Sequence, residues 1–248
     1  MKNKILIISL LFLISSLQCL GQEKKTRKFE LGPKVGLSLG AAIPFPLNKI
    51  PKGATAYPQI NALLGVFSFY HISDFWCIGT GFDLSKNSFA FDANVKSQKY
   101  ISTSPLTGRK QTLYYTGPTS GNFEFDYILF PIKAKFKFSK LYTATFGIYF
   151  SYVYFQKFEI EAIGGKTGLS PDPNMQNPTP RVDYDFNDDL SNFEWGLSGA
   201  VQRKILNHLF IELELELSPK TIFKKGFDSI DYKLYPFHIQ IGLSYDLL

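Results

Sequence analysis

The sequence contains few of the residues from which metal and redox sites are built. It has 2 cysteines, 3 histidines and 2 tryptophans among 248 residues. Because the spacing of His71, His208 and His238 matches no metal motif, we predict no metal site, no cofactor and no catalytic residue. Cys19 lies in the N-terminal apolar segment, which leaves Cys77 alone in the remainder. We expect Cys77 to be a small buried residue with no disulfide partner.

Long apolar runs are also missing beyond the first 21 residues. The N-terminal segment has the layout of a secretory signal: basic Lys2 and Lys4, an apolar run over residues 5–14, and small residues before Gln22. The run is too short for a membrane helix, which needs ~20 apolar residues. We therefore predict a cleaved signal peptide over residues 1–21 and an exported domain over residues 22–248. A lipoprotein cysteine at Cys19 is the alternative, although the residues before it match a lipobox poorly.

A concentrated basic tract is absent as well. Removing residues 1–21, which hold two lysines and no acidic residue, lowers the formal net charge from +6 to +4. This modest, dispersed charge gives no reason to expect nucleic acid as a partner. Phenylalanine and tyrosine are abundant instead, with 24 and 14 copies. Both residue types favour β-strands, and aromatic residues form belts at the two membrane interfaces of outer-membrane barrels.

Apolar side chains recur at every second position along seven of eight segments, and the remaining one, Gln59–Tyr70, is apolar on both faces, so its phase is unclear. Each segment is long enough to cross a bilayer as a strand. The segments are Phe29–Ala41, Gln59–Tyr70, Trp76–Phe89, Phe123–Phe138, Tyr142–Ala162, Leu190–Arg203, His208–Leu217 and Tyr235–Leu248. In the fourth, Phe123, Phe125 and Tyr127 have the opposite phase to the apolar residues that follow, which predicts a β-bulge near Tyr127. In the fifth, we expect Phe158 and Ile160 to continue the outer face that begins at Ala144.

The connections between these segments alternate between long and short. The long ones are Pro44–Pro58, Asp92–Gly121, Gly164–Asp189 and Ser218–Leu234, and the short ones are His71–Phe75, Ser139–Leu141 and Lys204–Asn207. Long outer loops and short periplasmic turns are the rule for outer-membrane barrels. We therefore predict an all-β fold, an eight-stranded antiparallel transmembrane up-and-down β-barrel in the outer membrane. A soluble β-sandwich is the alternative, but its strands usually have only ~5–6 residues.

Four stretches carry a resemblance to a known family. They are residues 20–22 (LGQ), residues 32–40 (GPKVGLSLG), residues 127–135 (YILFPIKAK) and residues 241–247 (IGLSYDL). With these, the chain resembles the PorT-like outer-membrane β-barrel proteins of the Bacteroidetes. The resemblance implies an outer-membrane barrel and, for a few members of the family, a link to type IX protein secretion. Leu248 stands where many outer-membrane proteins end in an aromatic residue.

Two columns of like charge are expected to face the barrel interior. Lys133, Lys135 and Lys137 alternate along the fourth segment, and Glu212, Glu214 and Glu216 along the seventh. The interior of an eight-stranded barrel is just wide enough to be filled by side chains. We predict that the two columns meet across the lumen as a structural charge network that plugs the barrel. An ion or proton path lined by the same residues is the rival interpretation.

Nothing else in the sequence indicates catalysis. A lipid-modifying enzyme would need His238 to recruit an acidic partner such as Glu159 or Glu161. Residues 164–167 (GGKT) lack the upstream glycine of a phosphate-binding loop, so we expect a turn. The long connections at 92–121 and 164–189 are expected to be loops without a core of their own.

We therefore predict a non-enzymatic outer-membrane barrel with a structural or interaction role. Outer-membrane lipid and lipopolysaccharide are its expected surroundings, and envelope proteins are potential partners of its outer loops. An accessory component of type IX secretion and a narrow solute or ion channel are the alternatives.

Overall fold

The computed structural model describes residues 28–47, 50, 53–103, 109–227, 229–230 and 232–248, so the predicted signal peptide lies outside the described residues. The strands are β1 (Phe29–Phe45), β2 (Thr55–His71), β3 (Trp76–Thr103), β4 (Lys110–Lys137), β5 (Tyr142–Gly168), β6 (Asn177–Asp185), β7 (Phe193–Lys204), β8 (Leu209–Leu217) and β9 (Lys233–Tyr245). Two 3-10 turns, η2 (Pro173–Met175) and η3 (Asn187–Asp189), flank β6. In the described part of the chain, no helix is both long and apolar enough to cross a membrane.

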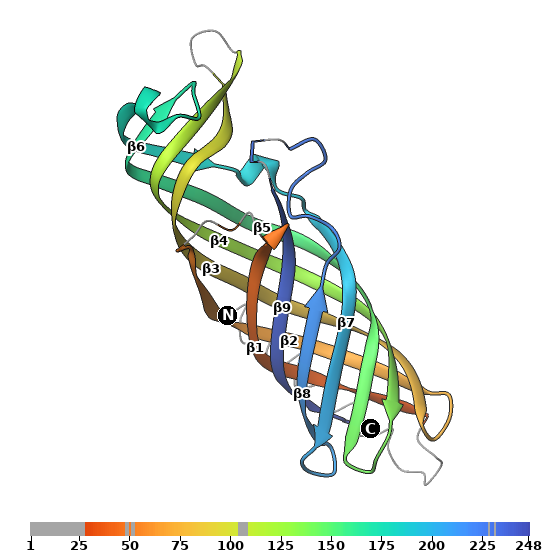
Figure 1. The fold of residues 1–248 in the computed structure, drawn as a ribbon. Helices are drawn as coiled ribbons and strands as arrows, with labels where there is room; N and C mark the ends of the chain where they lie inside the picture. Colours follow the sequence, from red (N-terminus) through yellow and green to blue (C-terminus); the bar gives the residue numbers. More distant parts are fainter. Residues whose placement is uncertain (1–27, 48–49, 51–52, 104–108, 228, 231) are drawn as a thin grey trace, which may run out of the picture.

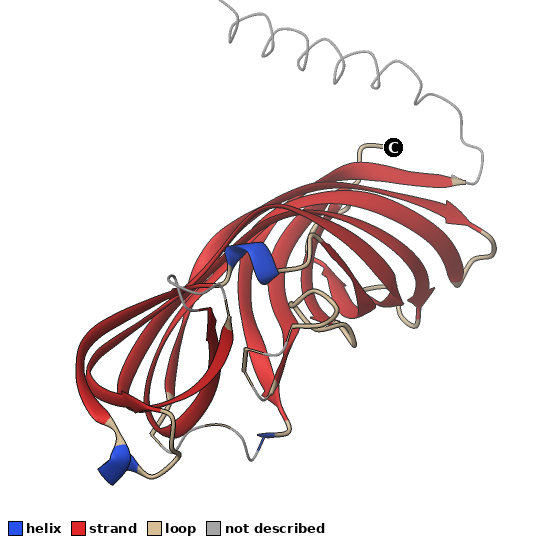
Figure 2. Cartoon of the chain, turned by 90° about the horizontal axis from the view of Figure 1, so that it is seen from above, coloured by secondary structure: helices blue, strands red, loops and turns tan. Residues whose placement is uncertain are grey.

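Eight of the strands close into a ring. The order of hydrogen-bonded neighbours is β4-β3-β2-β1-β9-β8-β7-β5, and a β4–β5 pairing completes the circle, with every pair antiparallel. The predicted eight-stranded antiparallel barrel is therefore confirmed, as are the three short turns. The view from above shows the strands curving around a common interior (Figure 2). The ninth strand, β6, is not part of this ring. It pairs with the outer part of β5, beyond the residues of β5 that pair with β7 (Figure 1).

The period of two places apolar side chains outside and polar ones inside. On β1, Val35 and Leu37 face outward and are about half exposed, whereas Lys34 and Ser38 are buried in the interior. β8 follows the same pattern, with outward leucines and inward glutamates. Aromatic pairs lie near the short turns, including Phe29 with Tyr70 and Trp76 with Phe136, as expected for an interfacial belt.

The phase change near Tyr127 has another cause than the one predicted. A register shift does fall at Asp126 and Tyr127, but the extra residue is on β5, where the partners jump from Phe155 to Val153. β4 keeps its phase, and its aromatic residues before Tyr127 point into the barrel because the interior there is apolar. The prediction that Phe158 and Ile160 continue the outer face of β5 is wrong, since the bulge turns both inward: Phe158 is 2% exposed, and Ile160 packs against the same apolar cluster.

Two of the predicted loops are largely strand. β3 and β4 continue through 92–121 as a hairpin that pairs as far as Thr103 and Lys110, and β5 continues to Gly168 against β6. Residues 164–167, expected as a turn, belong to β5. Together with β6, these outer segments of β3, β4 and β5 form an extension of the barrel. The extension has its own small core of Val95, Tyr100, Tyr115 and Ala162. The expectation that these segments have no core is therefore wrong, because the hairpin and β6 curl enough to bury one face.

Candidate functional site

The centre of the lumen is a buried ion network around Lys34 of β1. Its ammonium Nζ lies 2.9 Å from Glu212 Oε1, 2.9 Å from Glu214 Oε2 and 3.6 Å from Asp83 Oδ2. It also donates a hydrogen bond to Gln240 Oε1 at 3.3 Å. Lys34 is 6% exposed and Glu214 is fully buried. Buried charges remain ionised only when they are paired and hydrogen-bonded, and this network provides such partners.

The structure brings part of the two predicted columns together. Lys133 of β4 forms an ion pair with Glu214 of β8 across the lumen. Glu212 contacts Lys34, and its carboxylate also accepts a hydrogen bond from Gln202 of β7. The remaining members of the two columns do not take part in these contacts. Both carboxyl oxygens of Glu216 are buried without a hydrogen-bond partner among the described residues.

Lys135 and Lys137 contact Glu30 of β1 instead of the β8 glutamates. Their Nζ atoms lie 2.7 Å and 2.8 Å from the Glu30 carboxylate, in a separate cluster toward the short turns. The two columns of like charge in the sequence do not include Glu30, Lys34 or Asp83, so their place in the network was not predicted. The available signal was the alternation itself, which places all three on the inward face of their strands.

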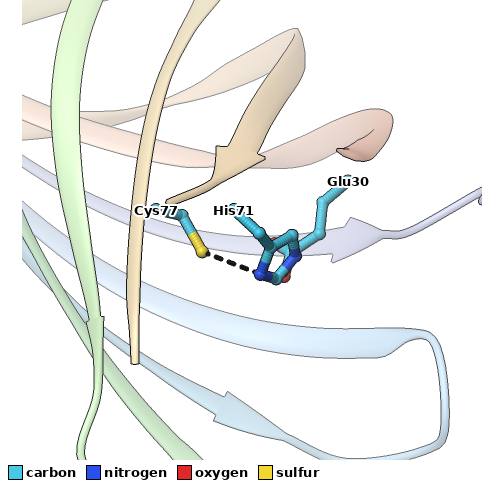
Figure 3. A group of neighbouring side chains, drawn as sticks. All are labelled: Glu30, His71 and Cys77. Carbon is cyan, nitrogen blue, oxygen red and sulfur yellow. Dashed lines mark hydrogen bonds and ion pairs between the residues drawn. The ribbon is translucent and has the colours of Figure 1, made fainter. Parts of the chain in front are cut away.

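Glu30, His71 and Cys77 gather in this lower cluster (Figure 3). His71 Nε2 lies 3.0 Å from Glu30 Oε1, and its Nδ1 lies 3.3 Å from Cys77 Sγ. These are metal-ligand side chains, and all their ligand atoms lie within 4.8 Å of one another. However, the ammonium groups of Lys135 and Lys137 already pair with the Glu30 carboxylate, and Lys137 Nζ also lies 3.4 Å from His71 Nδ1. Both ammonium groups would repel a cation bound here. We therefore interpret the cluster as the lower end of the charge network.

A polar layer around His238 lies above Lys34. His238 Nε2 is 3.3 Å from Glu194 Oε1, and Tyr149 donates a hydrogen bond of 2.5 Å to the same carboxylate. Asn87 contacts the other side of the imidazole and donates to the Tyr127 hydroxyl. Glu159 and Glu161, the acidic partners considered for a lipid-modifying enzyme, are 47% and 36% exposed on the outer surface, where they pair with Lys157 and Arg181. The acidic partner of His238 is therefore Glu194.

An aromatic layer closes the lumen above His238. The ring centroid of Phe123 lies 4.8 Å from that of Phe89 and 5.0 Å from that of Phe158. Cavities beside this layer and beside Lys34 have volumes of only about 20 Å³ each. A void of that size holds about one water molecule. The ion network, the histidine layer and the aromatic layer thus fill the middle of the barrel in succession.

A larger space lies above the aromatic layer, inside the extension. It has a volume of about 350 Å³ and is walled by β3, β4, β5 and β6, by the outer ends of β1 and β2, and by the segment that leads into β9. Phe91, Tyr100, Tyr115 and Tyr184 contribute much of the wall. Preformed apolar cavities of this size, especially in the mouths of β-barrels, are typical small-molecule sites.

Comparison with known proteins agrees with this architecture. The model of the family described as "Outer membrane protein beta-barrel domain" matches residues 20–223. No curated protein matches the chain.

Solved structures give distant matches. The attachment invasion locus protein Ail of Yersinia pestis, in complex with the heparin analogue sucrose octasulfate, is 8% identical, with a TM-score of 0.41 over 89% of this chain and 99% of Ail. OprG of Pseudomonas aeruginosa is 9% identical, with a TM-score of 0.36 over 88% of this chain and 94% of OprG. The family match spans most of the sequence, so the chain belongs to the outer-membrane β-barrel domain family and is an integral protein of the outer membrane.

Proposed function

We propose that this protein is a non-enzymatic, non-conducting barrel that anchors an outward-facing binding extension. One observation carries the proposal: the cavities in the middle of the lumen are about 20 Å³ each, whereas the extension encloses about 350 Å³. A conducting pore needs a continuous water-filled path, and successive layers of packed charged and aromatic side chains oppose one. The extension carries the surface on which a partner or ligand can act.

Conductance across planar bilayers tests the closed lumen. We expect no single-channel steps from purified wild-type protein, with a porin as the positive control. Reproducible steps that are absent from mock-purified material would contradict the proposal and favour the narrow channel. Heat-modifiable migration on a detergent gel shows that the protein used is folded.

An accessory role in type IX secretion, which the PorT-like resemblance implies, is a second version of the interaction role. It would use the same outer surfaces or the lower rim of the barrel to contact envelope proteins. Cross-linking in cells followed by purification tests it: enrichment of secretion subunits supports that role, and enrichment of lipopolysaccharide alone supports a simple envelope protein.

A further inference from the structure

The cavity in the extension is chemically uniform. Aromatic and aliphatic side chains make up most of its wall, and none of its described lining residues carries a charge. Among its polar groups, Tyr115 donates a hydrogen bond of 2.8 Å to Pro118 O, and Thr119 donates one of 3.2 Å to Ala93 O. The Tyr184 hydroxyl is buried without a hydrogen-bond partner among the described residues. A charged ligand would lose its hydration here without gaining a partner. The chemistry therefore selects an uncharged, apolar molecule.

The floor of the cavity separates it from the ion network. Phe89 and Phe158 line both the cavity and the packed aromatic layer, and Phe91 lies 6.4 Å from Phe158 between ring centroids. The space is thus a pocket that ends at this layer. Its volume is more than twice the ~150 Å³ of an engineered apolar cavity that binds benzene in another protein. A molecule larger than one aromatic ring is therefore expected to fill it.

The pairing between β1 and β2 ends beside this pocket. The β1–β2 ladder runs from Phe29 and Tyr70 to Leu39 and Ile60, and then stops. Beyond Leu39, β1 continues to Phe45 paired with β9 alone, and residues 55–59 of β2 pair with β3 alone. The two outer ends therefore diverge, as their separation in Figure 1 shows.

Small residues from the outer ends of both strands line the pocket. Ala42 and Pro44 come from β1, and Thr55 and Ala56 from β2. The outer ends of both strands carry exposed apolar side chains, since Ile43, Phe45, Tyr57 and Ile60 are 38–68% exposed. A hydrophobic molecule that partitions to these side chains would lie close to the pocket.

We propose that this pocket binds an uncharged apolar small molecule of about the size of a two-ring aromatic hydrocarbon, which enters between the outer ends of β1 and β2. The proposal deepens the binding role proposed above and rests on it. Conductance measures closure of the lumen and ligand binding measures the pocket, so either proposal can fail without the other.

The test is binding of 1-fluoronaphthalene, followed by fluorine NMR, to the full mature protein in phosphatidylcholine nanodiscs. Empty nanodiscs give the background of partition into lipid. Ala93→Trp places a large ring in the pocket, and Asn94→Trp adds the same ring to the exposed opposite face of β3. Ala42→Phe fills the pocket from β1 and serves if Ala93→Trp does not fold. Heat-modifiable migration shows which variants are folded.

We expect saturable binding to wild type and to Asn94→Trp, weakened at least tenfold by a folded pocket-filling variant. Binding no greater than that of empty nanodiscs, or equal binding by the filled variants, would overturn the proposal. Native mass spectrometry is a second readout. A phospholipid retained by wild type and lost from the filled variant would assign the pocket to a lipid acyl chain and would also overturn it.

Discussion

Glu214 and Glu216 offer a matched test of the buried ion network. They lie two residues apart on β8, both point into the lumen and both are fully buried. Glu214 contacts Lys34 and Lys133, whereas neither oxygen of Glu216 has a hydrogen-bond partner in the described part of the chain. Replacement by Gln preserves the shape at either position and removes the carboxylate. The two substitutions should therefore differ only in the contacts that they break.

The expected magnitude follows from the partners that remain. Removing one member of a buried ion pair costs about 3–5 kcal/mol, since its partner is left uncompensated. In Glu214→Gln, Lys34 keeps Glu212 at 2.9 Å, and Lys133 loses its carboxylate. We therefore expect the lower end, about 3 kcal/mol, for Glu214→Gln. For Glu216→Gln we expect a loss below about 1 kcal/mol, because no ion pair or hydrogen bond is broken.

Urea unfolding in lipid vesicles, followed by tryptophan fluorescence, measures both variants. The temperature at which the unboiled gel band disappears gives an independent ranking. Equal losses for the two variants, or a larger loss for Glu216→Gln, would refute the pairing described here. A double replacement of Lys133 and Glu214 by Met is the control for uncompensated charge. It should recover part of the loss from Glu214→Gln, because a buried ion pair can often be replaced by apolar residues of similar volume.

Three further predictions concern the centre, the wall and the aromatic layer. Lys34→Met should destabilise the barrel more than Glu214→Gln does in the same urea assay, because it leaves three carboxylates without their shared cation. Gly36→Ala should strongly reduce the yield of the heat-modifiable form, because the added Cβ would lie 2.4 Å from the carbonyl oxygen of Ile241. Gly242→Ala should reduce this yield little, because its added Cβ would lie 3.3 Å from the nearest atom. Phe158→Ala should cost about 3–5 kcal/mol in urea unfolding, as expected for loss of a buried aromatic side chain, and wild-type stability would contradict a packed plug.

The sequence predicted the barrel because period-two alternation and loop length are local signals. Val35 beside Lys34, or Leu213 beside Glu214, assigns a face without knowledge of any other strand. The partners of each lysine could not be predicted in this way, because they depend on the stagger of the strands around the ring. Lys133 reaches Glu214, while Lys135, two residues along, is already beside Glu30.

The extension was missed for a related reason. Proline, glycine and charged residues between 92 and 121 and between 164 and 189 indicate loops when they are considered alone. They form strands because β3, β4, β5 and β6 pair with one another and bury a common apolar face. Pairing over such distances along the chain is tertiary information, and local propensity does not contain it.

The position of β6 has a consequence for how copies of this protein coexist in one membrane. Among the described strands, β6 pairs with β5 alone, so its other side is an open edge at the far end of the molecule. Open edges recruit strands from neighbouring chains and promote aggregation. β6 contains Pro178 and Pro180, which have no N–H to offer, and its charged Arg181 and Asp183 are each 62% exposed. Neighbouring copies in one membrane can therefore present this edge to one another without joining into a continuous sheet.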